Sequence, residues 1–190
     1  MTDVAPPAAR MLALPAALAA RGFVLRPETE ADVPFLRRLY VSTRWEELGP
    51  IIDWSEAQKQ AFLESQFALQ RHHYRTYYAS TEWSVLEHEG VPAGRLYLDR
   101  QATAFCVVDI SLLPEWRRRG IGTALMLAVC AEARAAGKSV TVAVEKYNPA
   151  QTLYRRLGFR EFDDQGIYWF MEWRAGPDEC GENRGHAESG

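Results

Sequence analysis

The stretch from Leu112 to Thr123, LLPEWRRRGIGT, has the residue types and spacing of a phosphate-binding turn. Its two glycines let the backbone turn tightly and approach a ligand. The apolar residues before it and the Ala- and Leu-rich residues after it predict a strand, a turn and a helix. The first N–H groups of that helix have no partner within the helix and favour an anion, and three arginines add donors for phosphate oxygens. The alternative for an Arg-Gly cluster is a solvated surface turn.

A second stretch about thirty residues downstream repeats the order of strand and helix. Residues 140–145 alternate like a strand, and residues 148–159, NPAQTLYRRLGF, follow as a short helix closed by Gly158. The side chain of Asn148 is expected to cap the helix that Pro149 begins.

Together the two stretches resemble the GNAT superfamily of N-acetyltransferases. The acetyl-CoA signature of that family is Gln or Arg, any two residues, Gly, any residue, and Gly or Ala, which Arg117, Gly120 and Gly122 match. The second signature is matched by Asn148, Leu153, Tyr154, Leu157, Gly158 and Phe159. The resemblance covers roughly residues 22–174. It implies a mixed α/β fold, with a central, mostly antiparallel twisted sheet in which two parallel strands splay apart between flanking helices.

The resemblance also implies where acetyl-CoA, the co-substrate, lies. The diphosphate is expected at the turn, on Arg117, Arg118, Arg119, Gly120, Ile121, Gly122 and Thr123. The pantetheine arm would fill the gap between the splayed strands and bond to the backbone of Leu112 and Leu113, where a bulge would aim an N–H at the thioester carbonyl. These leucines can be core residues as well, because side chain and backbone serve separately. Asn148 would contact the arm while it caps its helix, since a carboxamide has two functional ends.

The chemistry implied is direct attack of a primary amine on the thioester, through a tetrahedral intermediate whose oxygen needs an N–H donor. Tyr154 stands where the family usually protonates the departing thiolate. A phenol, with a pKa of about 10, is protonated at neutral pH and can donate to a thiolate, whose acid has a pKa of about 8.5. The alternative for Tyr154 is an aromatic ring packed on the sheet.

A general base must take a proton from the amine, because a primary amine with a pKa of about 10.4 is mostly protonated near neutral pH. Some relatives keep a glutamate two residues before the position of Glu145, where this chain has Ala143. Strand alternation places Asp109 and Ser111 on one face, so Asp109 is the predicted base. Glu82 and Glu145 are weaker candidates. An acid on a strand face can instead be paired or solvated.

The helix predicted to begin after Ser55 offers the one clue to the acceptor. At 100° per residue its apolar side chains form a broad sector, made of Phe62, Leu63, Phe67, Leu69 and Tyr74. The polar residues Gln66, Gln70 and His73 fall inside this sector. They either bond to neighbouring backbone, lie at the interface of a homodimer, or orient the substrate. On the last interpretation Gln66 and His73 are the predicted substrate-binding residues.

Pattern and position predict the other elements. Strands are expected at residues 23–26, 83–88, 93–99, 104–113, 139–145, 161–163 and 167–173, and helices at 31–41, 55–74, 120–136 and 149–157. Two helices thus precede a sheet that starts as an antiparallel meander. Residues 1–21 are predicted to form an N-terminal arm, residues 22–174 the acetyltransferase domain and residues 175–190 a disordered tail.

Composition sets wider bounds. A chain of 190 residues with 47% hydrophobic content can build one core, and a formal net charge of −3 gives no pull toward nucleic acid or anionic membranes. Three widely spaced cysteines favour a reducing compartment, hence the cytoplasm, over disulfides or a zinc site. The apolar run at residues 11–20 is far too short to span a membrane, and its resemblance to a secretory leader is loose.

The sequence therefore predicts an acetyl-CoA-dependent N-acetyltransferase that acts without a metal on a primary amine of a small molecule or a protein. The alternative is a non-catalytic acyl-CoA-binding regulatory module, which would keep Gly120 and Gly122 but tolerate the loss of Tyr154. A nucleic-acid binder that uses the three arginines of the turn would lack a wider basic face.

Overall fold

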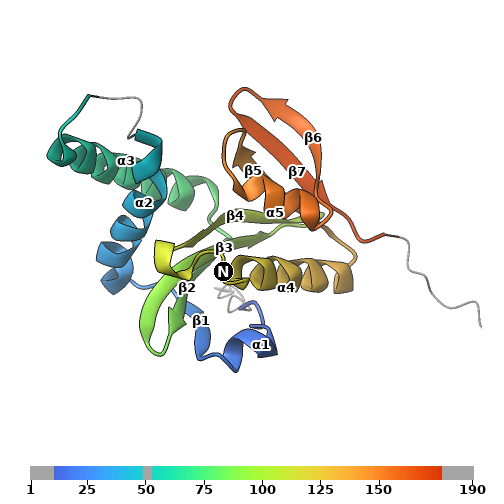
Figure 1. Cartoon of the computed structure of the whole chain (residues 1–190). Coiled ribbons are helices and arrows are strands. Elements are labelled where there is room, and N and C mark those ends of the chain that lie inside the picture. Colours follow the sequence, from blue (N-terminus) through green and yellow to red (C-terminus); the bar gives the residue numbers. More distant parts are fainter. Residues whose placement is uncertain (1–10, 49–52, 177–190) are drawn as a thin grey trace, which may run out of the picture.

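The structure, a computed structural model, describes residues 11–48 and 53–176. Within these residues seven strands form one sheet in the order β1-β2-β3-β4-β5-β7-β6 (Figure 1). The strands are β1 (Phe23–Pro27), β2 (Glu82–His88), β3 (Val91–Arg100), β4 (Ala104–Leu112), β5 (Ser139–Glu145), β6 (Arg160–Gln165) and β7 (Tyr168–Trp173). All neighbours pair antiparallel except β4 and β5, which pair parallel. The predicted mixed α/β fold class is confirmed.

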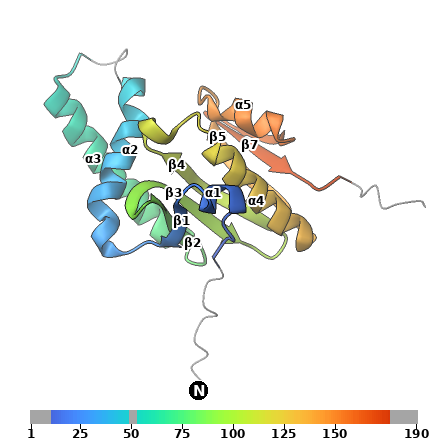
Figure 2. The same ribbon diagram turned by 60° about the horizontal axis from the view of Figure 1, so that its bottom comes forward.

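Helices cover the two faces of the sheet unequally. The helices α1 (Ala16–Ala19), α4 (Ile121–Ala135) and α5 (Ala150–Arg156) pack on one face, and Figure 2 shows α1 and α4 in front of the strands. The helices α2 (Val33–Leu48) and α3 (Glu56–Tyr77) form a pair on the other side, with a smaller core of their own. The helix α4 is amphipathic at helical spacing, since it buries Ile121, Leu125, Met126, Val129, Cys130 and Ala133.

The N-terminal segment from Met11 onward packs into the main core. Leu12 and Leu18 are 4% and 1% exposed, and the backbone N–H of Leu12 donates to the buried carboxylate of Glu82. The packed part of the chain thus begins ahead of the predicted domain boundary at residue 22. Residues 1–10 of the predicted arm and residues 177–190 of the predicted tail lie outside the described residues.

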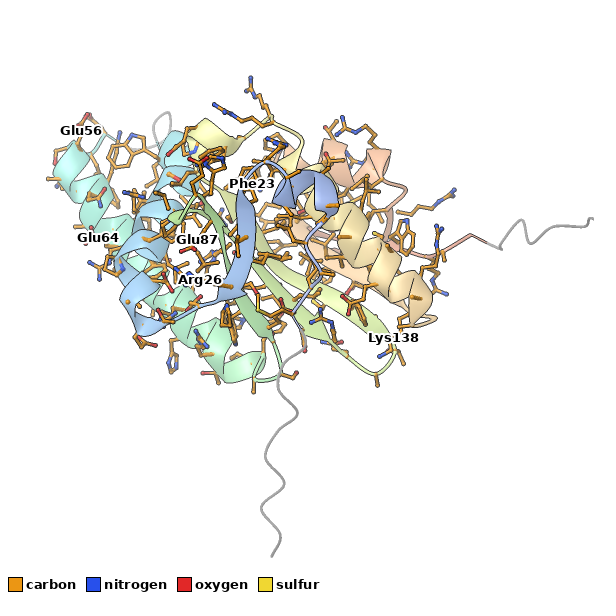
Figure 3. The ribbon with its side chains drawn as sticks, turned by 90° about the horizontal axis from the view of Figure 1, so that it is seen from below. Phe23, Arg26, Glu56, Glu64, Glu87 and Lys138 are labelled. Carbon is orange, nitrogen blue, oxygen red and sulfur yellow. The ribbon has the colours of Figure 1, made fainter. Side chains whose placement is uncertain are left out.

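Ion pairs join β1 to β2 and to the start of α2. Arg26 and Glu87 point toward each other from adjacent strands (Figure 3), with Nε of Arg26 2.7 Å from Oε1 of Glu87. The same guanidinium donates to both carboxylate oxygens of Asp32, which also accepts from the N–H of Thr29. The hydrogen bond from Arg26 is the main cause that lowers the pKa of Asp32. These contacts fix the position of the start of α2. The helix runs to Leu48, well past the predicted end at residue 41.

Candidate active site

The parallel pair β4 and β5 separates partway along its length. Residues Ala104–Val107 pair with Ser139–Val142, and beyond them β4 pairs only with β3 while β5 pairs only with β7. The rest of the two strands therefore leaves backbone groups along a widening gap. Figure 1 shows the α2–α3 pair and the β5–β7–β6 part of the sheet on opposite sides of β4. The splayed parallel strands that the sequence predicted are confirmed.

A β-bulge lies in β4 where the gap begins. Tyr97 pairs with Asp109 and Leu98 with Val107, so Val108 is the extra residue. The predicted bulge at Leu112 and Leu113 is wrong, because the ladder with β3 stays regular there.

The reason for that regular ladder is a close approach of backbones. Leu112 lies opposite Gly94, and the N–H of Leu113 donates to the carbonyl of Ala93 at 3.0 Å. A Cβ on Gly94 would lie 2.5 Å from the carbonyl oxygen of Ser111, so only glycine lets β3 come this near. The N–H of Leu113 is thus already used within the sheet.

The phosphate-type turn has the backbone that its glycines predict. Arg118 and Gly120 have φ angles of +58° and +76°, and α4 begins at Ile121 directly after them. Left-handed residues in a turn orient successive N–H groups toward one point, which suits an anion, and such a φ costs a non-glycine residue about 1–2 kcal/mol. The side chain of Ile121 is buried, so only its backbone is available to a ligand. Gly122 and Thr123 follow in the first turn of the helix, where N–H groups lack helical partners.

The three arginines of the turn differ in their surroundings. Arg117 points into the protein, where its Nε donates to the carbonyl of Leu112 at 2.9 Å and its Nη2 to the carbonyl of Ser42 at 3.2 Å. Its side chain therefore fastens the turn to α2. Arg118 and Arg119 are exposed and remain available to an anion. A further cation that the sequence did not reveal lies beside the turn. It is Arg156 at the end of α5, whose guanidinium approaches the hydroxyl of Thr123 at 3.5 Å.

Asn148 caps α5 as predicted. Its side-chain oxygen accepts from the N–H of Ala150 at 2.9 Å, and its backbone carbonyl accepts from the N–H of Gln151. Among the described residues its amide nitrogen has no hydrogen-bond partner, so the second end of the carboxamide is available.

Tyr154 combines a packed ring with an unbonded hydroxyl. The side chain is 4% exposed and its ring centre lies 5.7 Å from that of Phe159, yet no described residue hydrogen-bonds to the hydroxyl. Burial raises the pKa of Tyr154, and the negative charge of Asp109 raises it further. The hydroxyl therefore keeps its proton at neutral pH.

Asp109 faces the α2–α3 side together with Ser111, as strand alternation predicted. Arg95 binds it through two bonds, from Nε to Oδ1 at 3.1 Å and from Nη2 to Oδ2 at 2.6 Å. The Ser111 hydroxyl donates to Oδ1 at 2.6 Å, and the Tyr74 hydroxyl lies 3.4 Å from Oδ2. Donors thus occupy both oxygens of Asp109, and the paired alternative is the one the structure has.

The two weaker candidates for the base are held in the same way. Glu145 accepts from Arg44 at 2.6 and 2.7 Å, and Glu82 accepts from Arg100 at 2.5 Å. Every carboxylate considered from the sequence is therefore engaged by an arginine. Their partners were hidden from the sequence because each arginine lies on another element than the carboxylate that it binds.

The acceptor side of α3 differs from the predicted pattern. The predicted apolar sector is wrong at Leu69, which is 62% exposed, while Leu63 and Phe67 are buried. His73 is exposed and its ring packs at a tilt against that of Tyr77, with ring centres 4.6 Å apart. Gln66 is half-buried and lies on the same helix.

Other residues of α3 reach the strands. The side-chain oxygen of Gln70 accepts from Nη2 of Arg95 at 3.0 Å, and the hydroxyl of Tyr74 approaches Asp109. The spacing of Gln66, Gln70 and Tyr74 by four residues puts them on one helix face, which is the signal that could have marked the last two.

The described residues hold no group of three or more His, Cys, Asp or Glu placed to bind a metal ion. A groove of about 730 Å³ between α2 and α3 includes Arg37, Arg71 and Arg75 but none of the predicted site residues. Asp109 and Leu112 lie on β4 beyond its last pair with β5, and Asn148 follows shortly after β5, so these predicted residues flank the gap. Across residues 11–48 and 53–176, no helix has the length and apolar character needed to cross a bilayer.

A sheet with one splayed parallel pair, a glycine turn and a helix behind it defines a class of fold, and residues 75–161 match the sequence profile described as acetyltransferase (GNAT) domain. This match identifies residues 75–161 as a GNAT acetyltransferase domain. No curated protein matches the chain by sequence.

Solved structures share this fold at low identity. PaiA N-acetyltransferase from Thermoplasma acidophilum, in complex with coenzyme A, has a TM-score of 0.61 and 18% identity, over 80% of this chain and 99% of that one. The ribosomal-protein-S18-alanine N-acetyltransferase from Escherichia coli has a TM-score of 0.53 and 19% identity, over 85% and 97%. YncA from Salmonella typhimurium, with acetyl-CoA, has a TM-score of 0.50 and 20% identity, over 84% and 99%.

Proposed function

We propose that this protein is an N-acetyltransferase that moves the acetyl group of acetyl-CoA to a primary amine. The observation that carries the proposal is the gap between β4 and β5, which opens at a bulge on Val108 and is followed by the left-handed glycine turn at the start of α4. Tyr154 on α5 adds a hydroxyl to which no described residue hydrogen-bonds. The choice of acetyl-CoA is supported by the bound coenzyme A and acetyl-CoA of two proteins with the same fold.

The cofactor-binding residues have separate roles in this proposal. The left-handed turn at Arg118 and Gly120 and the first N–H groups of α4 bind the diphosphate, and the exposed guanidinium groups of Arg118 and Arg119 add charge. The pantetheine arm lies between β4 and β5 like an added strand, and the free amide nitrogen of Asn148 donates to it. Arg117 acts indirectly, because its bonds to Leu112 and Ser42 hold the turn.

The transfer step forms a carbon–nitrogen bond and breaks the carbon–sulfur bond of the thioester. The amine nitrogen bonds to the thioester carbon, and a backbone N–H at the Val108 bulge stabilises the oxygen of the tetrahedral intermediate, an interaction worth about 3 kcal/mol in other enzymes. The carbon–sulfur bond breaks and the leaving thiolate takes the proton of Tyr154. The proton of the new ammonium group returns to Tyr154 through solvent.

The amine must enter this step without its own proton. Because Asp109, Glu145 and Glu82 are each bound by an arginine, we assign no carboxylate as the base. The amine loses its proton to water, and the uncharged fraction attacks. This assignment replaces the sequence-based hypothesis of Asp109 as the base.

A thiol-release assay with acetyl-CoA against a panel of primary amines, both small molecules and peptides, tests the proposal. Release of one thiol for each acetylated amine is the expected result. Calorimetry with coenzyme A separates the failures: binding without turnover on any amine indicates an acyl-CoA-binding regulatory module, whereas no heat at millimolar coenzyme A removes the enzymatic interpretation.

A further inference from the structure

Arg95 is a buried arginine in the middle of β3 whose guanidinium is bonded within the protein. Arg95 is 3% exposed, and its guanidinium donates two hydrogen bonds to Asp109 and a third to Gln70. A buried ion pair adds little stability, because lost hydration offsets the attraction and an apolar pair of similar size is often as stable. The position of the pair therefore calls for a further explanation.

The pair lies directly beside the bulge of β4. The apolar residues Phe105 and Val107 face the core with α4, and after the extra residue Val108 this face is continued by Ile110 and Leu112. If Val108 paired with Tyr97, the register would shift by one residue and Asp109 would lie opposite Leu96, in the apolar core.

Arg95 prevents this shift from its place on β3. It lies opposite Ser111, on the face toward α3, and its two bonds hold Asp109 on that same face. Only the bulge at Val108 puts Asp109 there.

We propose that Arg95 is a positioning residue for acetyl transfer, which fixes the Val108 bulge through Asp109 and so aims the N–H that binds the thioester oxygen. The proposal rests on the proposed function, because the N–H matters only if a thioester lies in the gap. Arg95 itself contacts no substrate.

The same pair joins the bulge to α3. Gln70 accepts from Arg95 and the Tyr74 hydroxyl approaches Asp109, so two residues of this helix contact the pair. Burial is the main cause that raises the pKa of Tyr74, and the hydroxyl stays a neutral donor toward the carboxylate. The helix on the acceptor side and the thioester end of the gap are therefore held by one network.

The test replaces the pair by apolar side chains in the full chain. The double variant Arg95→Met with Asp109→Leu leaves no unpaired charge, and Leu at 109 favours the shifted register. We expect kcat to fall about 100-fold, as for misplaced catalytic groups elsewhere, with little change in the KM of acetyl-CoA or in Tm. Arg95→Lys keeps the charge but loses the planar guanidinium that donates to both oxygens of Asp109. An intermediate kcat is therefore expected.

Two further measurements make the result decisive. The double variant Arg100→Met with Glu82→Gln is the matched control, because this pair also includes a residue of β3 and lies on the opposite face, and below its melting temperature it is expected to keep kcat. Amide NMR signals of Val108 and Asp109 should move in the double variant more than that of Phe105, whether or not the protein is active.

Wild-type kcat in the double variant, or unmoved Val108 and Asp109 signals, would overturn the proposal. If the double variant does not fold, Arg95→Lys decides on the same two readouts. If the wild-type protein transfers no acetyl group, the proposed function fails while the NMR result still tests how the bulge is fixed.

Discussion

Tyr154 has a buried side chain, and no described residue hydrogen-bonds to its hydroxyl, which suits a group that protonates a leaving thiolate. Tyr154→Phe keeps the ring that packs on Phe159 but removes the proton. We expect kcat to fall by about 10²–10⁴, with the Kd of coenzyme A unchanged by calorimetry. Tyr168→Phe, which alters a partly exposed tyrosine on β7, should keep kcat. Equal turnover by the Tyr154 variant would remove this residue from the mechanism.

The pH profile follows from the direction of the Tyr154 shift. Burial and Asp109 raise its pKa above the usual value of about 10, so the acid form persists over the whole range in which a primary amine with a pKa of about 10.4 loses its proton. We expect kcat/KM to rise with pH up to about 10 and to show no falling limb below it. A bell-shaped profile centred near neutral pH would contradict this and indicate a protein base.

Substitution of Gly120 tests the phosphate turn, and Gly137, at the other end of α4, provides the control. Gly120 and Gly137 flank α4, both have positive φ angles, and a Cβ on either meets nothing within 4 Å. Substitution by Glu thus brings a similar backbone strain of about 1–2 kcal/mol at both positions. Only Gly120→Glu also places a negative charge at the expected diphosphate, so we expect coenzyme A affinity to fall at least about 100-fold there and to change little in Gly137→Glu. Comparable loss in both would argue against a phosphate site at the turn.

At the scale of the elements, β3 and β4 approach each other closely at Gly94. A Cβ there would lie 2.5 Å from the Ser111 carbonyl oxygen and 3.3 Å from Cα of Leu112. Gly94→Ala must therefore move β3 away from the end of β4 that borders the gap. Overpacking of this kind costs about 1–3 kcal/mol. Urea unfolding should show that loss, and amide exchange at Leu113, which bonds to Ala93, should become faster. An unchanged exchange rate would mean that the end of β4 accommodates the methyl group without losing the hydrogen bond of Leu113.

Local pattern predicted most elements but not their partners. The two glycines of the turn and the periodic apolar residues of α4 need only neighbours in sequence, and both were found. The switch of apolar positions in β4, from 105 and 107 to 110 and 112, also marks the bulge in the sequence. The binding of Asp109 by Arg95 requires the register between β3 and β4, and the contact with Gln70 requires the packing of α3, which no single segment encodes.

At the scale of the whole molecule, two cores lie on opposite faces of one sheet, and the gap opens where neither covers it. The main core extends from α4 to the N-terminal segment, and the smaller core joins α2 and α3 to Val85 and Leu113. Ala143 is an exposed residue on the interior strand β5, between Val142 and Val144 of the main core, so the opposite face of β5 is open there. The gap is therefore framed by parts that are stabilised separately, so stability and activity should be separable by mutation.

The N-terminal segment provides that test, because Leu12 and Leu18 belong to the main core. Leu18 is 1% exposed against this core, so Leu18→Ala should lower the free energy of unfolding by about 2–4 kcal/mol. Val24→Ala, which truncates a side chain 55% exposed on β1, should change it by less than about 0.5 kcal/mol. Below its melting temperature the Leu18 variant should keep the kcat of the wild type. A large loss of kcat with the protein still folded would show that the main core also controls the geometry of the gap.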